Sequence, residues 1–498
     1  MPTTLNDNGA PTDDGRATLV APGLRGTIDA HQGGTRFPLP EELEQAFRAA
    51  DVTVADEIEI DAETTRWLPP DAGTRGGSER AVTLTVPGIT EGWGQALLVQ
   101  ESDGRIRWIT DGRPLGQGGA RGGAKAQYEI PLGEQPQPDS GKDGGTERGV
   151  IGSIVKKVVK VLVFKLIEEG AGYAANHFAA AWEHKAHPSL LRRYTADGRD
   201  AYTVPATASL PPEDLASFDG QTTLLIVHGI MSRSHSGSGF GSLPKDLVAE
   251  LNQRYDGRIL AFDHPTVSVD PTANAAKLLE LLAGVRPQFD VLCHSRGGLV
   301  TRVLAEHFGL LPGAGAPLDI RGVVMAGTPN NGSTIADPRN VSKLLDTVTN
   351  LLDFLPDNPV TDPLSLVLSV VKQVAVGAMG GLDGLTCMAP GSTFLRMLNG
   401  AGAGTANYRA IASDFEPAGG SPLSLLAEDL ALDALFAREP NDMLVPEVSV
   451  YEANGAGTFP IKSPLLLPIA RSVRHSGYWR SEDVASSLRD WLPFEPVA

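Results

Sequence analysis

From residue 221 to the C-terminus, short apolar runs alternate with longer stretches in which apolar residues recur at helical spacing. Five runs resemble strands: TLLIVHG, RILAFDHP, FDVLCHS, RGVVMAGTP and YRAIASDF. Strands that alternate with helices are typical of a mostly parallel α/β sheet with flanking helices. We therefore expect residues 221–498 to form one α/β domain. Helical spacing is found at Lys245–Arg254, Pro271–Leu282, Gly297–Phe308 and, near the end, in SEDVASSLRDWL.

The chain before residue 133 follows a different pattern, with short alternating segments such as AVTLTV. Asp103-Gly104 separates the strand-like runs GQALLVQES and RIRWIT, which is a strong hairpin signal. Residues 36–132 therefore predict a small β-rich domain, with a sandwich as one arrangement. Residues 1–35 begin polar and rich in glycine, proline and aspartate, and predict a disordered tail. Residues 133–149 predict a linker rich in glycine and proline.

Residues 150–220 are expected to form a helical connector, because 150–182 has the length and composition of a helix. Its lysines interrupt an apolar segment, which leaves two interpretations. The helix either lies at a membrane surface with lysines at the headgroups, or packs between domains with lysines reaching water. At about 100° per residue the lysines spread over about half of the helical wheel, which favours packing and leaves peripheral membrane contact as the alternative. These lysines are Lys156, Lys157, Lys160 and Lys165.

Composition narrows the classes of function. A chain of 498 residues predicts two or more folding units and leaves the oligomeric state open. The 42 basic and 60 acidic residues give a net charge of −18, which argues against nucleic-acid binding. Two cysteines are too few for a disulfide framework or a cysteine-built metal site. No secretory signal or apolar run of about 18 residues is visible, so we expect a cytoplasmic protein.

The segment FDVLCHSRGGLVTR carries the strongest chemical signal, because an apolar run ends at Ser295 and a helical pattern begins. A serine nucleophile needs a base, an acid that orients this base, and donors for the developing oxyanion. A strained turn between strand and helix also needs small neighbours, which Gly297 and Gly298 provide. Cys293 stands where G-x-S-x-G has its first glycine, and we expect this small residue to be tolerated as a core thiol. His294 is expected to support the turn.

CHSRGG resembles the GHSxGG turn of lipase-like members of the α/β-hydrolase superfamily. Three further segments resemble that group in the same order: the oxyanion-loop segment LLIVHGIM at 224–231, the GTPxxGS-like VVMAGTPNNGS at 323–333, and the acid and histidine loops NDMLVP at 441–446 and VRHSGYW at 473–479. These matches span roughly residues 220–492. Each is weak alone, whereas four in the right order are a strong signal.

The resemblance implies a role for each matching residue. Ser295 would be the nucleophile, His475 the general base and Asp442 the orienting acid. The oxyanion hole would use the backbone N–H groups of Arg296 and Ile230. Met231 is a near alternative for the second donor.

Each role has a competitor in the sequence. Asp414 ends the preceding strand and is the alternative acid, although Asp442 is favoured by its Val-Pro context. Only His475 follows both the serine and Asp442. His307 is expected on the helix leading away from the serine, and His264 could line the pocket.

The helical insertion at about 341–400 includes LLDTVTNLLDFLP and most of LSLVLSVVKQVAVGAMGG. In lipases an apolar lid of this kind covers the serine, and a plain helical cap is the alternative. The resemblance implies an α/β-hydrolase fold and a serine hydrolase that cleaves a carboxylic ester of a small molecule or lipid through an acyl-enzyme, with no cofactor or metal. A thioesterase or acyltransferase would use the same triad. A binding or scaffold protein that kept the fold is the alternative of another class.

Overall fold

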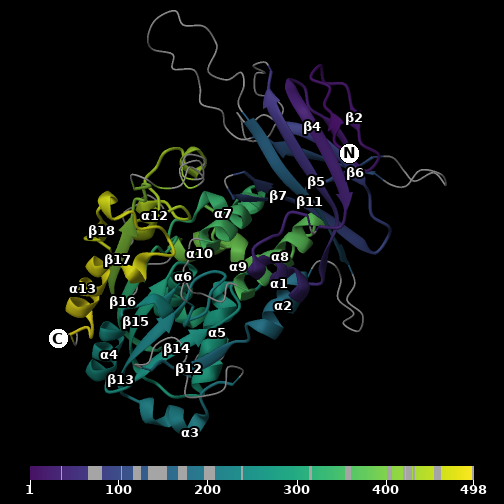
Figure 1. The fold of residues 1–498 in the computed structure, drawn as a ribbon. Helices are drawn as coiled ribbons and strands as arrows, with labels where there is room; N and C mark the ends of the chain where they lie inside the picture. Colours follow the sequence, from purple (N-terminus) through teal and green to yellow (C-terminus); the bar gives the residue numbers. More distant parts are fainter. Residues whose placement is uncertain are drawn as a thin grey trace, which may run out of the picture. The chain divides into compact units, whose positions relative to one another are not determined.

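The computed structural model consists of two compact units (Figure 1). The β unit comprises residues 1–178 and 367–379, and the α/β unit comprises residues 179–366 and 380–498. The predicted linker at 133–149 lies outside the described residues. The structure describes all residues except 35, 66–80, 103, 116–124, 133–153, 167–176, 196–207, 237–238, 313–316, 354–360, 401–405, 419–420, 422–424, 426–428, 430–431, 454–460 and 496–498.

The β unit contains two antiparallel sheets that share one hydrophobic core. Leu19 and Leu84 from one sheet and Ile60 and Val159 from the other are buried in that core, so the sheets pack face to face. The first sheet has the order β1 (Thr3–Thr4), β4 (Leu24–Gln32), β5 (Val52–Thr64), β11 (Ile154–Lys165), β7 (Trp93–Glu101), β8 (Ile106–Ile109). The second has the order β2 (Thr12–Asp13), β3 (Thr18–Val20), β6 (Ala81–Pro87), β10 (Lys125–Pro131), β9 (Arg113–Leu115).

The prediction of a disordered tail at 1–35 is wrong, because strands β1 to β4 lie there. Leu19, Leu24 and Ile28 bury their side chains in the core and hold the segment in place. The polar residues form turns between these strands. Asp14, for example, accepts hydrogen bonds from the backbone N–H groups of Ala17 (2.8 Å) and Ala30 (2.6 Å).

The helix predicted for 150–182 is also wrong over 154–165, where β11 forms a strand between β5 and β7. The register places Lys160 opposite Glu57 and Lys157 opposite Glu101, and each pair forms a buried salt bridge. The lysines therefore face carboxylates of neighbouring strands. Helix in the predicted connector 150–220 is limited, among the described residues, to α2 (Phe178–Ala186), α3 (Pro212–Leu215) and the short 3-10 turn that follows α3.

The mostly parallel sheet expected from the sequence is confirmed in the α/β unit. Its order is β12 (Leu190–Arg193), β14 (Ile259–Asp263), β13 (Thr222–Val227), β15 (Gln288–His294), β16 (Asp319–Ala326), β17 (Asn407–Ser413), β18 (Leu465–Leu467). Only β12 is antiparallel to its neighbour among these described strands. Because β12 precedes residue 221, the unit begins earlier in the chain than predicted.

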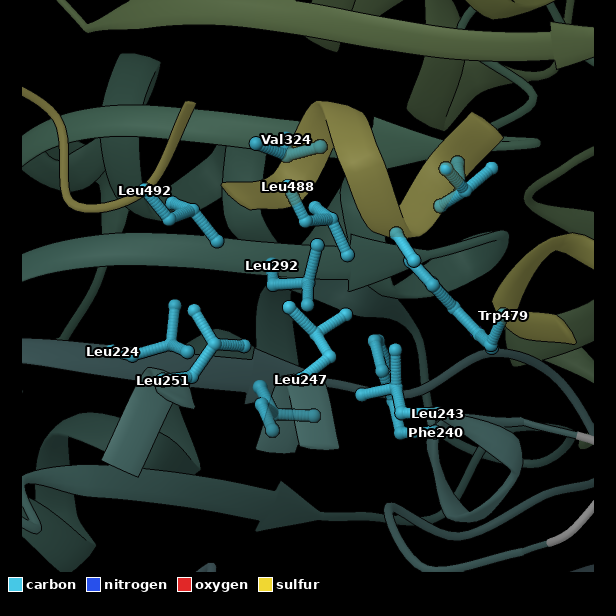
Figure 2. Close-up of a cluster of buried hydrophobic side chains, with 14 of the residues drawn as sticks. Leu224, Phe240, Leu243, Leu247, Leu251, Leu292, Val324, Trp479, Leu488 and Leu492 are labelled. Carbon is cyan, nitrogen blue, oxygen red and sulfur yellow. The ribbon is translucent and has the colours of Figure 1, made fainter. Parts of the chain in front are cut away.

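Helices α4 (Lys245–Arg254) and α13 (Glu482–Trp491) cover one face of this sheet. Figure 2 shows Leu247 and Leu251 of α4 and Leu488 of α13 directed at Leu224 and Leu292 of the sheet. α6 (Arg296–Glu306) packs against strands β13, β15 and β16 and against α5 (Pro271–Leu282).

The inserted segment contains α7 (Val341–Asp353), α8 (Thr361–Ala375), α9 (Asp383–Thr386) and α10 (Thr393–Gly400). Residues 367–379, which include the second half of α8, belong to the β unit, so the insertion is divided between the units. Within the β unit, Lys372 donates to the carbonyl of Ala50 at 3.0 Å, and its ammonium lies 4.7 Å from the ring centroid of Phe178. No helix in the described part of the chain is long and apolar enough to cross a membrane.

Candidate active site

The turn between β15 and α6 holds Ser295 in a strained backbone conformation. Its φ of 53° and ψ of −132° are unusual for a residue with a side chain, and such strain persists only where surrounding contacts impose it. The backbone N–H of Ser295 donates to the carbonyl of Ala326 at 2.8 Å, which ties the turn to the end of β16. A sharp strand-to-helix turn of this kind presents a serine hydroxyl at the carboxyl edge of the sheet.

Glycines allow the close approach of chains around this turn. A Cβ added at Gly297 would lie 2.3 Å from the carbonyl oxygen of Val227 and 2.5 Å from that of His228. A Cβ added at Gly229 would lie 2.7 Å from the Cβ of Ser295. The end of β13 therefore packs directly against the serine turn, and any side chain at these two glycines would push them apart.

Asp442 and His475 form a buried hydrogen-bonded pair. Asp442 Oδ2 accepts from His475 Nδ1 at 2.7 Å and from the hydroxyl of Tyr478 at 2.8 Å. Oδ1 accepts from the backbone N–H groups of Leu444 at 3.1 Å and Val445 at 2.8 Å. A carboxylate only accepts, so the proton of this hydrogen bond is on Nδ1 of the ring. Burial, together with the same carboxylate, raises the pKa of Tyr478 well above its ordinary value.

Two neighbours of Ser295 connect it to this pair. His294 donates from Nε2 to the backbone carbonyl of His475 at 3.0 Å, and their ring centroids lie 4.8 Å apart. A Cβ added at Gly327, the residue after β16, would lie 3.1 Å from both Asp442 Oδ2 and His475 Cε1. The ends of β15 and β16 thus bring Ser295 alongside the histidine and the aspartate. Burial lowers the pKa of His294 to about 3, so its ring is neutral and has a supporting position.

The backbone that follows β13 provides the candidate oxyanion donors. The N–H of Met231 donates to Thr266 Oγ1 at 3.0 Å, so this donor is already engaged. The N–H of His264 donates to His228 Nε2 at 3.1 Å, which leaves His228 Nδ1 to donate to the carbonyl of Gly229 at 2.9 Å. Burial lowers the pKa of His228 to about 4, and it also lowers the pKa of His264 well below its ordinary value. Both histidines are neutral structural groups.

The competing residues lie in other surroundings. Asp414 accepts from the backbone N–H of Asn441 at 3.2 Å and thereby supports the loop that carries Asp442. His307 donates to the carbonyl of Leu398 at 3.0 Å, at the far end of α6. Among the described contacts, the His475 ring donates its hydrogen bond to Asp442 and not to Asp414.

Cys293 is buried beneath the serine turn, with Sγ 3.4 Å from the carbonyl oxygen of Val324. Burial raises the pKa of this thiol to about 12, so it stays protonated and unreactive at neutral pH. Three groups around the site were not singled out in the sequence: the Tyr478 hydroxyl, the Glu183 carboxylate and the Thr266 hydroxyl. Tyr478 is three residues after His475 and Thr266 is three residues after β14, whereas no local signal marks Glu183. No group of metal-ligating side chains occurs within the described ranges.

A family model described as a domain of unknown function, DUF7379, matches residues 189–493. The chain belongs to this family. The matched part of this DUF7379 member runs from the residue before β12 to just beyond α13, so it includes the whole sheet and the candidate site. No curated protein matches the sequence.

Several solved structures are similar to parts of the DUF7379 member. The mature lipase BlEst2 of Bacillus licheniformis is 17% identical, with a TM-score of 0.32, over 55% of this chain and 91% of that one. Lipase 1 of Pelosinus fermentans is 15% identical, with a TM-score of 0.35, over 54% of this chain and 98% of that one. Phospholipase PlaB of Legionella pneumophila is 14% identical, with a TM-score of 0.32, over 54% of this chain and 63% of that one.

Proposed function

We propose that the protein is a serine hydrolase that cleaves a carboxylic ester through an acyl-enzyme on Ser295. One observation supports this proposal above the others. A buried aspartate–histidine pair lies next to the strand-to-helix turn in which Ser295 has a strained conformation. A structural role would not require that conformation, whereas a nucleophile must project its hydroxyl from the turn.

In the first step, Ser295 Oγ attacks the ester carbonyl while His475 Nε2 takes the hydroxyl proton. Asp442 holds the proton on His475 Nδ1 and stabilises the imidazolium that forms. The tetrahedral intermediate then collapses, and the imidazolium protonates the leaving alcohol. Water, deprotonated by the same histidine, attacks the acyl-enzyme and releases the acid, which regenerates Ser295.

The negative oxygen of the tetrahedral intermediate would be bound by the backbone N–H groups of Arg296 and Ile230. Arg296 opens α6, where N–H groups lack partners within the helix. Ile230 is favoured over Met231, because the N–H of Met231 donates to Thr266. Donors fixed in advance stabilise the transition state without reorganisation during the reaction.

The substrate class is an ester of a small molecule or a lipid. Ser295 is only 2% exposed and His475 only 4% exposed, so both side chains are largely covered in this structure. We propose that a movable lid covers them, and that α7, α9 and α10 of the insertion, which lie in the α/β unit, form this lid. A lid that opens at an interface would make the reaction depend on detergent or lipid.

Labelling by a fluorophosphonate probe tests the proposal, because the probe needs an activated serine and makes few demands on substrate shape. Wild-type protein should be labelled, Ser295→Ala should not, and mild detergent should increase the rate if a lid opens. Ser413→Ala is the matched control, since Ser413 is equally buried at a strand end but donates to the carbonyl of Val473. Folded wild-type protein that stays unlabelled in both conditions would refute the proposal and favour a non-catalytic binding protein.

A further inference from the structure

We propose that the buried carboxylate of Glu183, acting through the hydroxyl of Thr266, positions the oxyanion loop, residues 228–231, for catalysis. This role rests on the proposed function, because it concerns the geometry of a donor in the oxyanion hole. Glu183 and Thr266 are positioning residues that need not touch the substrate.

Glu183 lies on α2 with a fully buried side chain whose oxygens accept hydrogen bonds from a single short segment. Oε1 accepts from the backbone N–H groups of Thr266 at 2.7 Å and Val267 at 2.9 Å. Oε2 accepts from the backbone N–H of Ser268 at 2.7 Å and from its hydroxyl at 2.6 Å. Hydrogen bonds to a charged acceptor are stronger than those between neutral groups, so residues 266–268 are firmly held.

The Thr266 hydroxyl extends this connection to the oxyanion loop. It donates to Glu183 Oε1 at 3.3 Å, which directs a lone pair of Oγ1 toward the N–H of Met231 at 3.0 Å. Met231 has a φ of 50°, a conformation that needs outside support in a residue with a side chain. The carboxylate therefore orients the hydroxyl, and the hydroxyl fixes the peptide plane that follows Ile230.

The peptide plane before Ile230 is fixed from its other side. The carbonyl of Gly229 accepts from His228 Nδ1 at 2.9 Å and from the Ser232 hydroxyl at 3.0 Å. Because a peptide group is planar, the direction of this carbonyl sets the direction of the Ile230 N–H. With both flanking planes held, the proposed oxyanion donor has one orientation.

The segment held by Glu183, together with the next residue, Val269, is also joined to the serine turn. The guanidinium of Arg296, the residue after Ser295, donates to the carbonyls of Val269 and Gly384, the latter at 2.7 Å. Residues 266–269 thus contact the oxyanion loop through Thr266 and the nucleophile turn through Val269. This arrangement fixes the position of the two proposed oxyanion donors, at Ile230 and Arg296, relative to each other.

The comparison of Thr266→Val with Thr266→Ser tests the role of the hydroxyl at nearly constant volume. Loss of an oxyanion donor lowers kcat by about 10²- to 10³-fold, so misplacing one by loss of its support should lower kcat by about 10- to 100-fold. We expect that decrease for Thr266→Val on a chromogenic ester, with KM within about twofold. Thr266→Ser keeps the hydroxyl and should restore most of the rate. All rates are expressed per site titrated by the fluorophosphonate probe.

A pair of inhibitors separates catalytic positioning from a merely structural role. A trifluoromethyl ketone forms a tetrahedral adduct that needs the oxyanion donors, whereas the matching methyl ketone binds without them. In Thr266→Val, inhibition by the trifluoromethyl ketone should weaken by the same factor as kcat/KM, while inhibition by the methyl ketone stays unchanged. Equal weakening of both inhibitors would overturn the proposal.

Glu183→Gln provides a second variant in case Thr266→Val does not fold. Its amide keeps the shape but turns one acceptor into a donor, so the same selective loss of trifluoromethyl-ketone binding is expected. Active wild-type protein together with wild-type behaviour of both variants would overturn the positioning role and leave the hydrolase proposal standing. An unlabelled, inactive wild type would overturn both. If neither variant folds, the network is a folding element and the positioning role fails.

Discussion

Replacing Asp442 by asparagine changes one atom of a carboxylate that receives four hydrogen bonds in the interior. Oδ2 faces two donors, the His475 ring and the Tyr478 hydroxyl, and Oδ1 faces the backbone N–H groups of Leu444 and Val445. The amide NH₂ of asparagine must therefore point at one pair of donors or the other. Either orientation puts donor against donor in a buried site.

The two orientations have different consequences. If the NH₂ faces Leu444 and Val445, buried backbone groups lose their acceptor, at a cost of about 1–3 kcal/mol each in the free energy of unfolding. If it faces His475, Nδ1 must give up its proton, so Nε2 carries it and no longer acts as a base. The corresponding substitution in a serine protease triad lowers kcat by about 10⁴-fold. We expect a loss of about 10³- to 10⁴-fold here, on the same physical ground.

The assay compares Asp442→Asn with Asp414→Asn, the alternative acid. Ester hydrolysis and the rate of fluorophosphonate labelling are measured at equal folded concentration, with urea unfolding as the check on stability. Asp414 accepts from the N–H of Asn441, so asparagine there should cost less than about tenfold in kcat and should affect the loop only indirectly. Full activity in Asp442→Asn with near-complete loss in Asp414→Asn would refute the assignment of the acid.

Gly297→Ala should lower the free energy of unfolding by at least about 1–3 kcal/mol, because the added Cβ would lie 2.3 Å from the Val227 carbonyl; an unchanged urea midpoint would contradict this. Burial lowers the pKa of His294 to about 3 and of His228 to about 4, from an ordinary 6.5, so the unfolded chain binds protons first. The free energy of unfolding should therefore be highest above pH 6.5 and should fall by about 1.4 kcal/mol per pH unit for each histidine as the pH is lowered from 6.5 toward the pKa of the folded state. Equal urea midpoints at about pH 7.5 and about pH 5 would exclude this effect. Lys372→Met should lower the melting temperature by removing a hydrogen bond and a cation–π contact worth about 1–2 kcal/mol together, and Lys372→Arg is the control that keeps the charge.

The α/β sheet was predictable because its central strands are buried on both faces. FDVLCHS and RGVVMAGTP are continuous apolar runs, and such runs separated by helical periods leave few arrangements other than a parallel sheet. The candidate site followed from the same regularity. Residues just after parallel strands meet at one edge of the sheet, and chain order then separates nucleophile, acid and base.

β11 could not be recognised from its own sequence. IVKKVVKVLVFK mixes valines with lysines, and the charges that accept those lysines belong to other strands. Lys160 pairs with Glu57, 103 residues away, and Lys157 pairs with Glu101. When its partner is unknown, a lysine within an apolar run predicts a segment at the protein surface. In this structure these two lysines are paired, and the strand is buried. The choice of helix over strand was decided by contacts that no local window contains.

The hydrogen bonds of Glu183 are a second case in which contacts between distant segments could not be predicted from the local sequence, and here they concern the candidate site. Thr266 and Ile230 follow parallel strands, so their place near the serine can be inferred from the sheet alone. Glu183 lies on a helix that precedes the central strands, 83 residues before Thr266 in the chain. The sequence gives no reason for a buried carboxylate at this position, because its partners are the backbone N–H groups of residues 266–268. Reactive groups are confined to the strand ends by the fold, whereas groups that hold them can come from any segment that reaches the loop. Variants that alter rate without touching the substrate should therefore be sought among buried carboxylates and hydroxyls that bind loop backbone, and Glu183 and Thr266 are the first to examine.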